Sequence, residues 1–154
     1  VSSIIGGRSQ GRATYEWELR RYGPVVVCTD DASYGRPGFV HDEARDVLHT
    51  GDVDIVYAVG PVPMMRAVAN LTREFNVRTI VSLNPIMVDG TGMCGGCRVS
   101  VGNENKFACV DGPEFDGHKV DFDELADRLA SYRDFEQRAT KCANEDCQKK
   151  HPDH

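Results

Sequence analysis

The sequence predicts an α/β protein in three consecutive parts: an open parallel sheet covered by helices, a small glycine- and cysteine-rich module, and a C-terminal helix. The first part is indicated by short β-branched runs that alternate with amphipathic helical patterns up to about residue 84. The second is indicated by the end of helical periodicity at Pro85, and the third by its return at Asp121. Strands that are apolar on both faces and separated by helices are typical of parallel sheets.

Residues 1–84 are expected to form the sheet domain. Four runs have the composition of buried strands: residues 2–7, 24–30, 53–60 and 77–84. Three segments between them have the spacing of amphipathic helices: residues 13–23, 40–51 and 61–76. Tyr15 and Trp17, in the first of these helices, are expected to pack. In open parallel sheets ligands bind beyond the carboxyl ends of the strands, so binding residues are expected just after each strand.

Residues 85–120 are expected to form a module built around something other than a hydrophobic core. Helical periodicity is replaced here by glycines, cysteines and two short alternating strands, residues 97–101 and 106–110. The second of these strands is expected to end near Cys109, so that a hairpin returns this cysteine to the other two.

Residues 121–140 are expected to form a packing helix. Asp121 has the position of an N-cap, and Glu124, three residues later, completes an approximate capping box. Residues 141–154 follow as a polar tail. Two further cysteines of this tail indicate either an adventitious metal site or a disulfide: Cys142 and Cys147.

The composition excludes two classes of partner. The 154 residues carry a formal net charge of −6 and have a pI of about 5.3, so no broad basic surface is available for nucleic acid or an anionic membrane. No stretch approaches the roughly 20 apolar residues that span a bilayer, and no charged-then-apolar leader begins the sequence. We therefore expect a soluble, cytoplasmic protein. The sequence starts at Val1, without methionine and inside an apolar run, as expected of a piece cut from a longer protein.

Three of the six cysteines lie in the glycine-rich stretch from Met87 to Gly112. Cys94 and Cys97 form a C-x2-C pair, and Cys109 follows twelve residues after Cys97. Plant-type [2Fe-2S] sites use the spacing C-x4-C-x2-C followed by a distant cysteine. The stretch therefore matches this pattern from its second ligand onward.

Asp89 occupies the position at which the same spacing places the first ligand. It stands five residues before Cys94, and a carboxylate oxygen is an acceptable, harder ligand for iron. Three alternatives stay open on the residues alone. An aspartate before glycine often only caps a turn. The cysteines could instead bind zinc, with His118 nine residues beyond Cys109, or they could be free thiols.

The stretches "SLNPIMVDGTGMCGGCRVSV" and "KFACVDGPEFDGHKVDFDEL" resemble the C-terminal part of a flavoprotein family. These are the small subunits of NADH-dependent ferredoxin:NADP oxidoreductases, also called sulfide dehydrogenases; electron-transfer subunits of dihydroorotate dehydrogenases are similar, less closely. The resemblance implies a ferredoxin reductase-like nucleotide-binding domain and an oxidoreductase that passes electrons between NAD(P)H, FAD and a [2Fe-2S] cluster. It also implies a large flavoprotein/iron-sulfur subunit as hetero-oligomeric partner, with ferredoxin as a further one.

The resemblance also implies which residues hold the cluster. The first-named subunits have an aspartate ligand at the position of Asp89, whereas the dihydroorotate dehydrogenase subunits have cysteine there. The aspartate therefore favours the first relatives over the second. The implied ligands are Asp89, Cys94, Cys97 and Cys109.

Three upstream segments, each just after a predicted strand, resemble nucleotide-binding segments of the ferredoxin reductase superfamily. "GGRS" matches the place that holds the adenosine ribose or its phosphate, and "TDDASYG" matches a loop in which Ala32 departs from the family's glycine. "GPVPMM" matches a helix start beside the nicotinamide and pyrophosphate, where a helix N-terminus favours phosphate. A solvated arginine, a turn and packed methionines would explain the same segments structurally. The candidate residues are Gly7, Arg8, Ser9, Asp31, Gly35, Gly60, Pro61 and Met64.

Two parts of the superfamily pattern are absent from the sequence: the glycine-rich pyrophosphate loop after the first strand of the nucleotide domain, and the flavin-binding barrel. We therefore expect this chain alone to lack FAD, to bind NAD(P)H weakly or not at all, and to be inactive as an enzyme. No catalytic residue is assigned. The competing hypothesis from another class is a zinc-stabilised structural or interaction module with no reducible centre.

Overall fold

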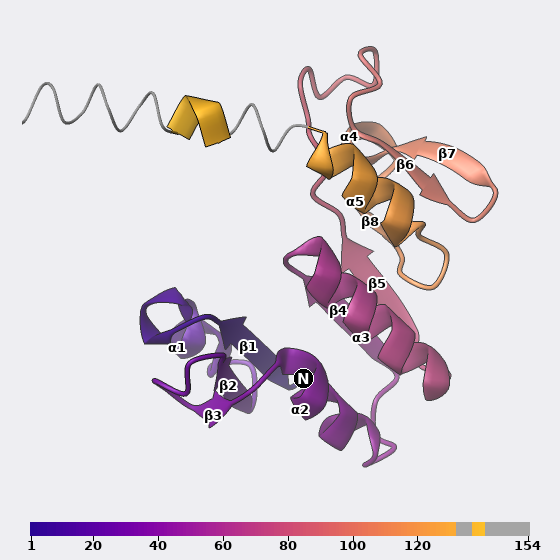
Figure 1. Cartoon of the computed structure of the whole chain (residues 1–154). Coiled ribbons are helices and arrows are strands. Elements are labelled where there is room, and N and C mark those ends of the chain that lie inside the picture. The colour runs from indigo at the N-terminus through magenta and orange to yellow at the C-terminus, as the bar shows by residue number, and fades with distance from the viewer. Residues whose placement is uncertain (132–136, 141–154) are drawn as a thin grey trace, which may run out of the picture.

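The computed structural model describes residues 1–131 and 137–140 of the 154. Its strands form two three-stranded sheets and a two-stranded hairpin. The hairpin and the last long helix lie beyond one end of the second sheet (Figure 1). The tail cysteines Cys142 and Cys147 lie outside the described residues.

The first sheet is entirely parallel. It is formed by β1 (Ser3–Gly7), β2 (Val25–Thr29) and the two-residue β3 (Arg36–Pro37). Gly7 lies opposite Thr29, so β1 and β2 end at the same edge of the sheet. The connection from β1 to β2 contains a 3-10 turn, η1 (Gln10–Arg12), and a short helix, α1 (Glu16–Leu19).

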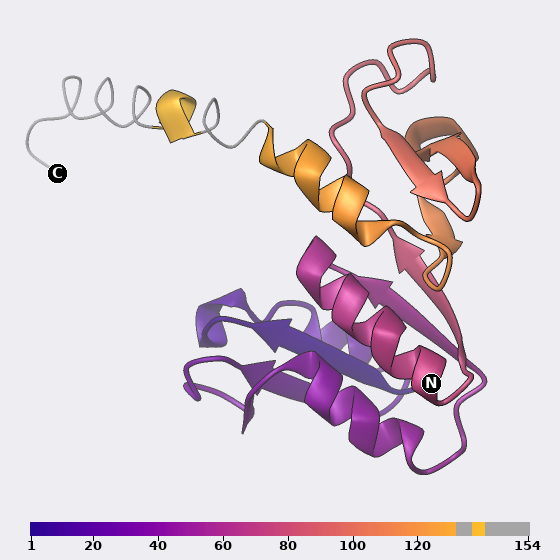
Figure 2. The same ribbon diagram turned by 45° about the vertical axis from the view of Figure 1, so that its right-hand side comes forward.

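The second sheet combines two parallel strands with one antiparallel strand from the cysteine-containing segment. β4 (Ile55–Val59) pairs in parallel with β5 (Arg78–Ser82), and β8 (Glu114–Asp116) pairs antiparallel with β5. Two helices cover the sheets and contact each other (Figure 2): α2 (Val40–Leu48), which packs on β1, and α3 (Val62–Glu74), which packs on β4 and β5.

The parallel α/β architecture is confirmed, but the single open sheet that the sequence predicts is divided into two. β1 is an edge strand of one sheet and β4 is an edge strand of the other, and among the described residues no hydrogen-bonded strand pair joins the two sheets.

Apolar side chains of β4 and α1 face solvent. Ile55, Tyr57 and Val59 are 37%, 67% and 72% exposed, and their alternation along β4 puts them on one face. Tyr15 and Trp17 are 71% and 80% exposed instead of packed, and the helix expected over residues 13–23 is reduced to the four residues of α1. An apolar sheet face is normally buried by a second layer, which the described residues do not supply here.

Cys109 lies in a helical turn and not at the end of a strand, so that prediction is wrong. β6 (Arg98–Val101) and β7 (Glu104–Phe107) form the expected antiparallel hairpin, and α4 (Ala108–Asp111) follows directly. The Asp111 carboxylate accepts a hydrogen bond from Phe107 N at 2.7 Å, which favours the turn over a continued ladder.

The helix α5 (Phe122–Ala130) begins as predicted. The Asp121 carboxylate accepts a hydrogen bond from Glu124 N at 2.9 Å, which confirms the N-cap. α5 helps to close one hydrophobic core that reaches from the second sheet into the cysteine-containing segment. Almost fully buried side chains from four elements meet there: Met65 of α3, Val81 of β5, Val99 of β6 and Leu125 of α5. The expectation that this segment is not built on a hydrophobic core is therefore corrected, and the division of the chain at residue 84 stays a prediction.

Candidate iron-sulfur site

Asp89 holds the loop between β5 and β6 in shape. Its Oδ1 accepts a hydrogen bond from Thr91 N and its Oδ2 accepts one from Cys94 N, both at 2.8 Å. Gly90 and Gly92 have φ angles of 73° and 83°, a left-handed conformation that lets the loop fold back on the carboxylate. The Thr91 N–H, followed by that of Cys94, lowers the pKa of the Asp89 carboxyl below its usual range. Asp89 therefore caps the turn and is ionised at neutral pH.

Cys94 lies beside Asp89 at the exposed end of this loop. Its backbone N–H bonds to Asp89, and its Sγ accepts a hydrogen bond from Gly96 N at 3.4 Å. Gly95, with φ of 67°, makes the turn that aims the Gly96 amide back at the sulfur. Backbone N–H groups that point at a cysteine sulfur stabilise its thiolate and tune a bound iron-sulfur centre.

Cys97 and Cys109 form a second pair, with Sγ atoms 3.1 Å apart. Cys97 is 1% exposed, and Cys109 is half-buried in α4. Burial opposes ionisation of Cys97, but hydrogen bonds from Cys109 and from Ala108 outweigh burial and lower its pKa. The hydrogen bond with Cys97, and then burial, raise the pKa of Cys109. The thiolate is the form of cysteine that binds metal.

Among the four implied ligands, the Sγ atoms of Cys97 and Cys109 lie together, and the Asp89 carboxylate contacts Cys94 through the Cys94 backbone N–H. In the described parts of the chain, no group of three or more His, Cys, Asp and Glu side chains is arranged to hold a single metal ion. The donor set nevertheless fits a two-iron cluster, whose ligands divide between two metal ions. A carboxylate offers about four acceptor positions, so each Asp89 oxygen keeps capacity after one hydrogen bond. The zinc alternative fits less well, because Nε2 of His118 lies 3.0 Å from Oγ1 of Thr72.

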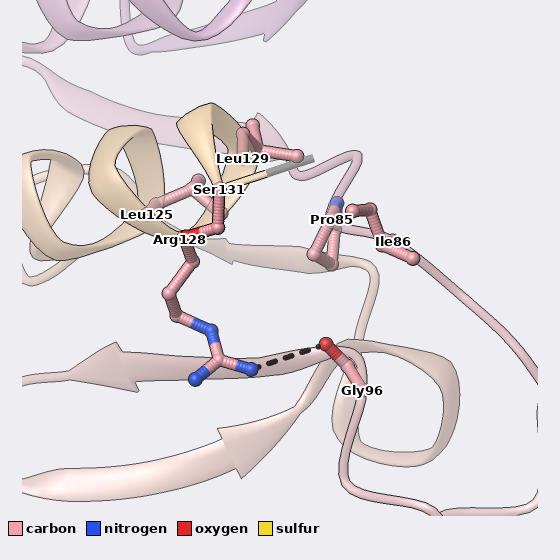
Figure 3. A pocket seen from close by; sticks show the side chains of 7 residues that line it. All are labelled: Pro85, Ile86, Gly96, Leu125, Arg128, Leu129 and Ser131. Atoms are coloured by element: carbon pink, nitrogen blue, oxygen red, sulfur yellow. Dashed lines mark hydrogen bonds between the residues drawn. The ribbon is translucent and has the colours of Figure 1, made fainter. Parts of the chain in front are cut away.

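A residue that the sequence did not single out contacts the cysteine loop. Arg128, in the last turn of α5, donates a hydrogen bond from Nη2 to the Gly96 carbonyl at 3.3 Å (Figure 3). No spacing rule connects these two residues, because only the packing of α5 brings them together. Arg128 and Gly96 also line a cavity of about 380 Å³ with Pro85, Ile86, Leu125, Leu129 and Ser131.

Four of the nucleotide-binding candidates lie together after β1 and β2. The backbone N–H groups of Asp30 and Asp31 donate to the carbonyls of Gly7 and Arg8, at 3.1 and 3.2 Å. The Asp31 carboxylate accepts a hydrogen bond from Ser33 N at 2.9 Å, and hydrogen bonding by Ser33 lowers the pKa of Asp31. The structure thus brings these candidates to one sheet edge: Gly7, Arg8, Ser9 and Asp31.

Three other candidates lie at the start of α3, in the second sheet. Gly60 follows β4, and Pro61 is the extended N-cap residue from which α3 begins. Met64 is half-buried against the shared core, as its packing explanation requires. The seven candidates described so far therefore belong to two different sheets.

Gly35, the remaining candidate, has a structural explanation. Its φ is 69°, and a Cβ at this position would clash with the carbonyl oxygen of Val27 in β2. Gly51 has a similar φ of 77°, but a Cβ there would meet no atom within 4 Å. The two glycines thus share the same backbone strain and differ in the space around them.

We expect Gly35→Ala to destabilise the protein more than Gly51→Ala. Each substitution costs about 1 kcal/mol for a left-handed backbone, and Gly35→Ala adds an overpacking cost of about 1–3 kcal/mol against β2. Urea unfolding measures the difference in free energy of unfolding. Equal values for the two variants would contradict a close approach of the loop to β2.

Residues 84–121 match a family model described as the iron-sulfur cluster binding domain of dihydroorotate dehydrogenase B. The matched segment contains Asp89 and the three cysteines of the loop and of α4.

Two relatives and one solved structure extend the similarity along most of the chain. The dihydroorotate dehydrogenase B (NAD(+)) electron transfer subunit homolog of Thermotoga maritima is 48% identical over 136 residues, which are 88% of this chain and 48% of that protein. The electron transfer subunit of dihydroorotate dehydrogenase B (NAD(+)) from Shouchella clausii is 38% identical over 119 residues, 75% of this chain and 44% of that protein. A chain of the NADH-dependent reduced ferredoxin-NADP oxidoreductase, a structure concerned with flavin-based electron bifurcation, is 44% identical with a TM-score of 0.80.

That structural match covers 91% of this chain and 51% of the solved one. The chain therefore spans about half the length of the relatives that it matches. The resemblance first seen in the cysteine loop is confirmed. Residues 84–121 belong to the family of dihydroorotate dehydrogenase B iron-sulfur cluster binding domains, in a chain homologous to the electron transfer subunits of that enzyme and to a chain of ferredoxin-NADP oxidoreductase.

Proposed function

We propose that the chain is the C-terminal part of a flavin- and iron-sulfur-dependent NAD(P)H oxidoreductase subunit, and that its loop binds a [2Fe-2S] cluster. The observation that carries this proposal is the approach of Cys97 and Cys109 to 3.1 Å, beside a loop in which Asp89 and Cys94 are already joined by a hydrogen bond. When bound, such a cluster accepts and releases single electrons.

Each pair of ligands would hold one iron. Cys97 and Cys109 would bind the inner iron, because Cys97 is buried. Asp89 and Cys94 would bind the outer iron, because both are exposed. Gly96 N–H, donating to the Cys94 sulfur, would stabilise the negative charge on the outer pair. An oxygen ligand on one side would make the two irons inequivalent.

In this proposal, residues 1–84 form a partial NAD(P)-binding domain and residues 85–120 the cluster-binding module. The packing helix expected over residues 121–140 contains α5 (Phe122–Ala130), and the predicted tail, residues 141–154, lies outside the described residues. The interruption between β1 and β4 supports a missing strand, and the exposed face of β4 supports a missing layer. FAD would belong to the part of the relatives' length that this chain does not span. The chain alone would then bind NAD(P)H weakly and be inactive.

An exposed apolar rim around the cluster loop supports a protein partner. Met87, Val88, Met93 and Val110 are 47%, 76%, 89% and 59% exposed, and such groups of exposed apolar side chains often mark protein interfaces. We propose that a larger flavoprotein/iron-sulfur subunit docks there, and that ferredoxin is the final acceptor or donor. In the described part of the chain, every helix is too short or too polar to cross a bilayer. The cytoplasmic location stays a prediction.

Two alternatives differ in testable ways. As an electron-transfer subunit of dihydroorotate dehydrogenase, the chain would deliver electrons to and from a different partner flavoprotein; the aspartate at position 89 weighs against this. As a zinc-stabilised interaction module, it would hold no reducible centre.

The proposal is tested by anaerobic reductive titration of two proteins with reconstituted clusters: the chain alone and the full-length parent. We expect dithionite to bleach the visible absorption of both, and NADH or NADPH to bleach only the flavin-containing parent. Bleaching of the isolated chain by NAD(P)H would contradict the proposal that electrons from NAD(P)H reach the cluster only through FAD in the rest of the parent. A parent that neither dithionite nor NAD(P)H bleaches would contradict the redox function.

A further inference from the structure

We propose that Arg128 is a positioning residue for the cluster: it fixes the Cys94–Cys97 turn and makes the reduction potential of the bound cluster less negative. This inference rests on the proposed cluster-binding function. The observation behind it is the hydrogen bond from the Arg128 guanidinium to the Gly96 carbonyl, at 3.3 Å (Figure 3).

Gly96 is the residue through which Arg128 would act. It stands between the two cysteines of the C-x2-C pair, and its N–H donates to the Cys94 sulfur at 3.4 Å. Gly96 is closely surrounded by other residues: a Cβ at this position would lie 3.4 Å from Val88 and 3.5 Å from the Cys94 sulfur. Arg128 holds the carbonyl end of the same residue. A shift of that carbonyl would therefore move the amide that faces the sulfur.

The base of Arg128 is fixed independently of the loop. α5 is capped by Asp121 at its start and anchored by Phe122 and Leu125, which are 7% and 2% exposed. Arg128 is half-buried where α5 meets the loop, so its hydrogen bond to the carbonyl is partly shielded from water. A hydrogen bond from a charged donor is stronger than one between neutral groups.

The charge of Arg128 has a predictable sign of effect. A guanidinium stays protonated at every accessible pH. Reduction of the cluster adds one negative charge, and a nearby fixed cation stabilises the more negative state. Loss of the cation would therefore make the potential more negative, whereas loss of the hydrogen-bond geometry alone would loosen the turn.

Three variants of the reconstituted chain separate these effects: Arg128→Gln removes the charge, Arg128→Lys keeps the charge but not the planar fork, and Arg66→Gln is the matched control. Arg66 lies on α3 and, like Arg128, makes a hydrogen bond that involves α5: it donates to the Asp123 carboxylate at 2.6 Å. Arg66 is exposed, in contrast to the half-buried Arg128. The measurements are the EPR-monitored redox midpoint and the half-life of the bound metal in excess chelator.

We expect Arg128→Gln to shift the midpoint to a more negative potential and to shorten the chelator half-life about 10-fold, the usual effect of losing an outer-shell partner. Arg128→Lys should have a midpoint potential close to that of the unmodified chain, because it keeps the charge, and should still lose metal faster than the unmodified chain. Arg66→Gln should match the unmodified chain in both measurements. An unchanged midpoint and half-life in Arg128→Gln, or equal changes in Arg66→Gln, would overturn the inference.

Failure of the proposed function gives a different result. A chain that binds zinc and no iron would overturn that function and, with it, the effect of Arg128 on a potential. The positioning effect would still be decided by the rate at which the Arg128 variants lose zinc.

Discussion

Cys97→Ala is expected to abolish cluster binding, with iron content falling from about two per chain to near zero. Cys97 is buried and lies 3.1 Å from Cys109. As a proposed ligand of the inner iron, it would leave that iron open to water when replaced by alanine. The measurement is iron content together with visible absorption after anaerobic reconstitution.

Cys28→Ala is the matched control for this experiment. Cys28 lies in β2, outside the cluster loop, and is 1% exposed like Cys97. Each of the two substitutions therefore removes one buried cysteine sulfur. Cys28→Ala should keep iron and absorption. Equal loss of iron in the two variants would mean that damage to the core removes the metal. A Cys97→Ala protein with full iron content would mean that Cys97 is not a ligand.

Substitutions of Asp89 are expected to separate its role in the turn from its role as an iron ligand. Asp89→Cys should keep the cluster and shift its EPR signal, because a thiolate replaces a harder oxygen ligand. Asp89→Ala should lower occupancy, because it removes both the ligand and the hydrogen bonds to Thr91 and Cys94. Asp89→Asn keeps an acceptor for one of these hydrogen bonds but is a poorer ligand, so its occupancy should also fall.

The comparison of Asp89→Asn with Asp89→Ala is decisive. If Asp89 only caps the turn, Asp89→Asn should keep the cluster with unchanged spectra, and Asp89→Cys should not alter the EPR signal. These results would contradict ligation by the carboxylate. The lowered pKa of Asp89 determines the pH at which these variants should be compared. Its hydrogen bonds are present above the ordinary aspartate pKa of about 3.9 and are lost as pH falls through the lower folded value, so variants should be compared near neutral pH.

The sequence predicts most elements of the fold because their signals are local. The strands β1, β2, β4 and β5 are β-branched runs, and the helix start at Asp121 depends on a capping pair three residues apart. The glycines that fold the cysteine loop are also readable from the sequence alone.

The features that the sequence does not predict depend on distant contacts. The division into two sheets depends on which strands pair with each other, and β1 and β4 are edge strands of different sheets among the described residues. Trp17 is exposed because the described residues place nothing over it, and periodicity cannot report that. Alternation along the sequence continues through Cys109 and predicts a strand there, whereas the Asp111 carboxylate turns the chain into α4.

The candidate site is predicted only in part, for the same reason. The spacing from Asp89 to Cys97 identifies three positions in one loop, but the approach of Cys109 depends on the hairpin formed by β6 and β7. Arg128 has no signal in the sequence, because its contact with Gly96 joins residues 32 positions apart and depends on how α5 packs.

The central claim is that the loop binds a [2Fe-2S] cluster, and metal analysis of anaerobically reconstituted protein tests it most directly. Iron, acid-labile sulfide and zinc are measured on one sample, with the visible spectrum and the EPR signal after reduction. The account predicts about two irons and two sulfides per chain with a reducible visible chromophore. A colourless protein with about one zinc per chain and no sulfide would contradict it.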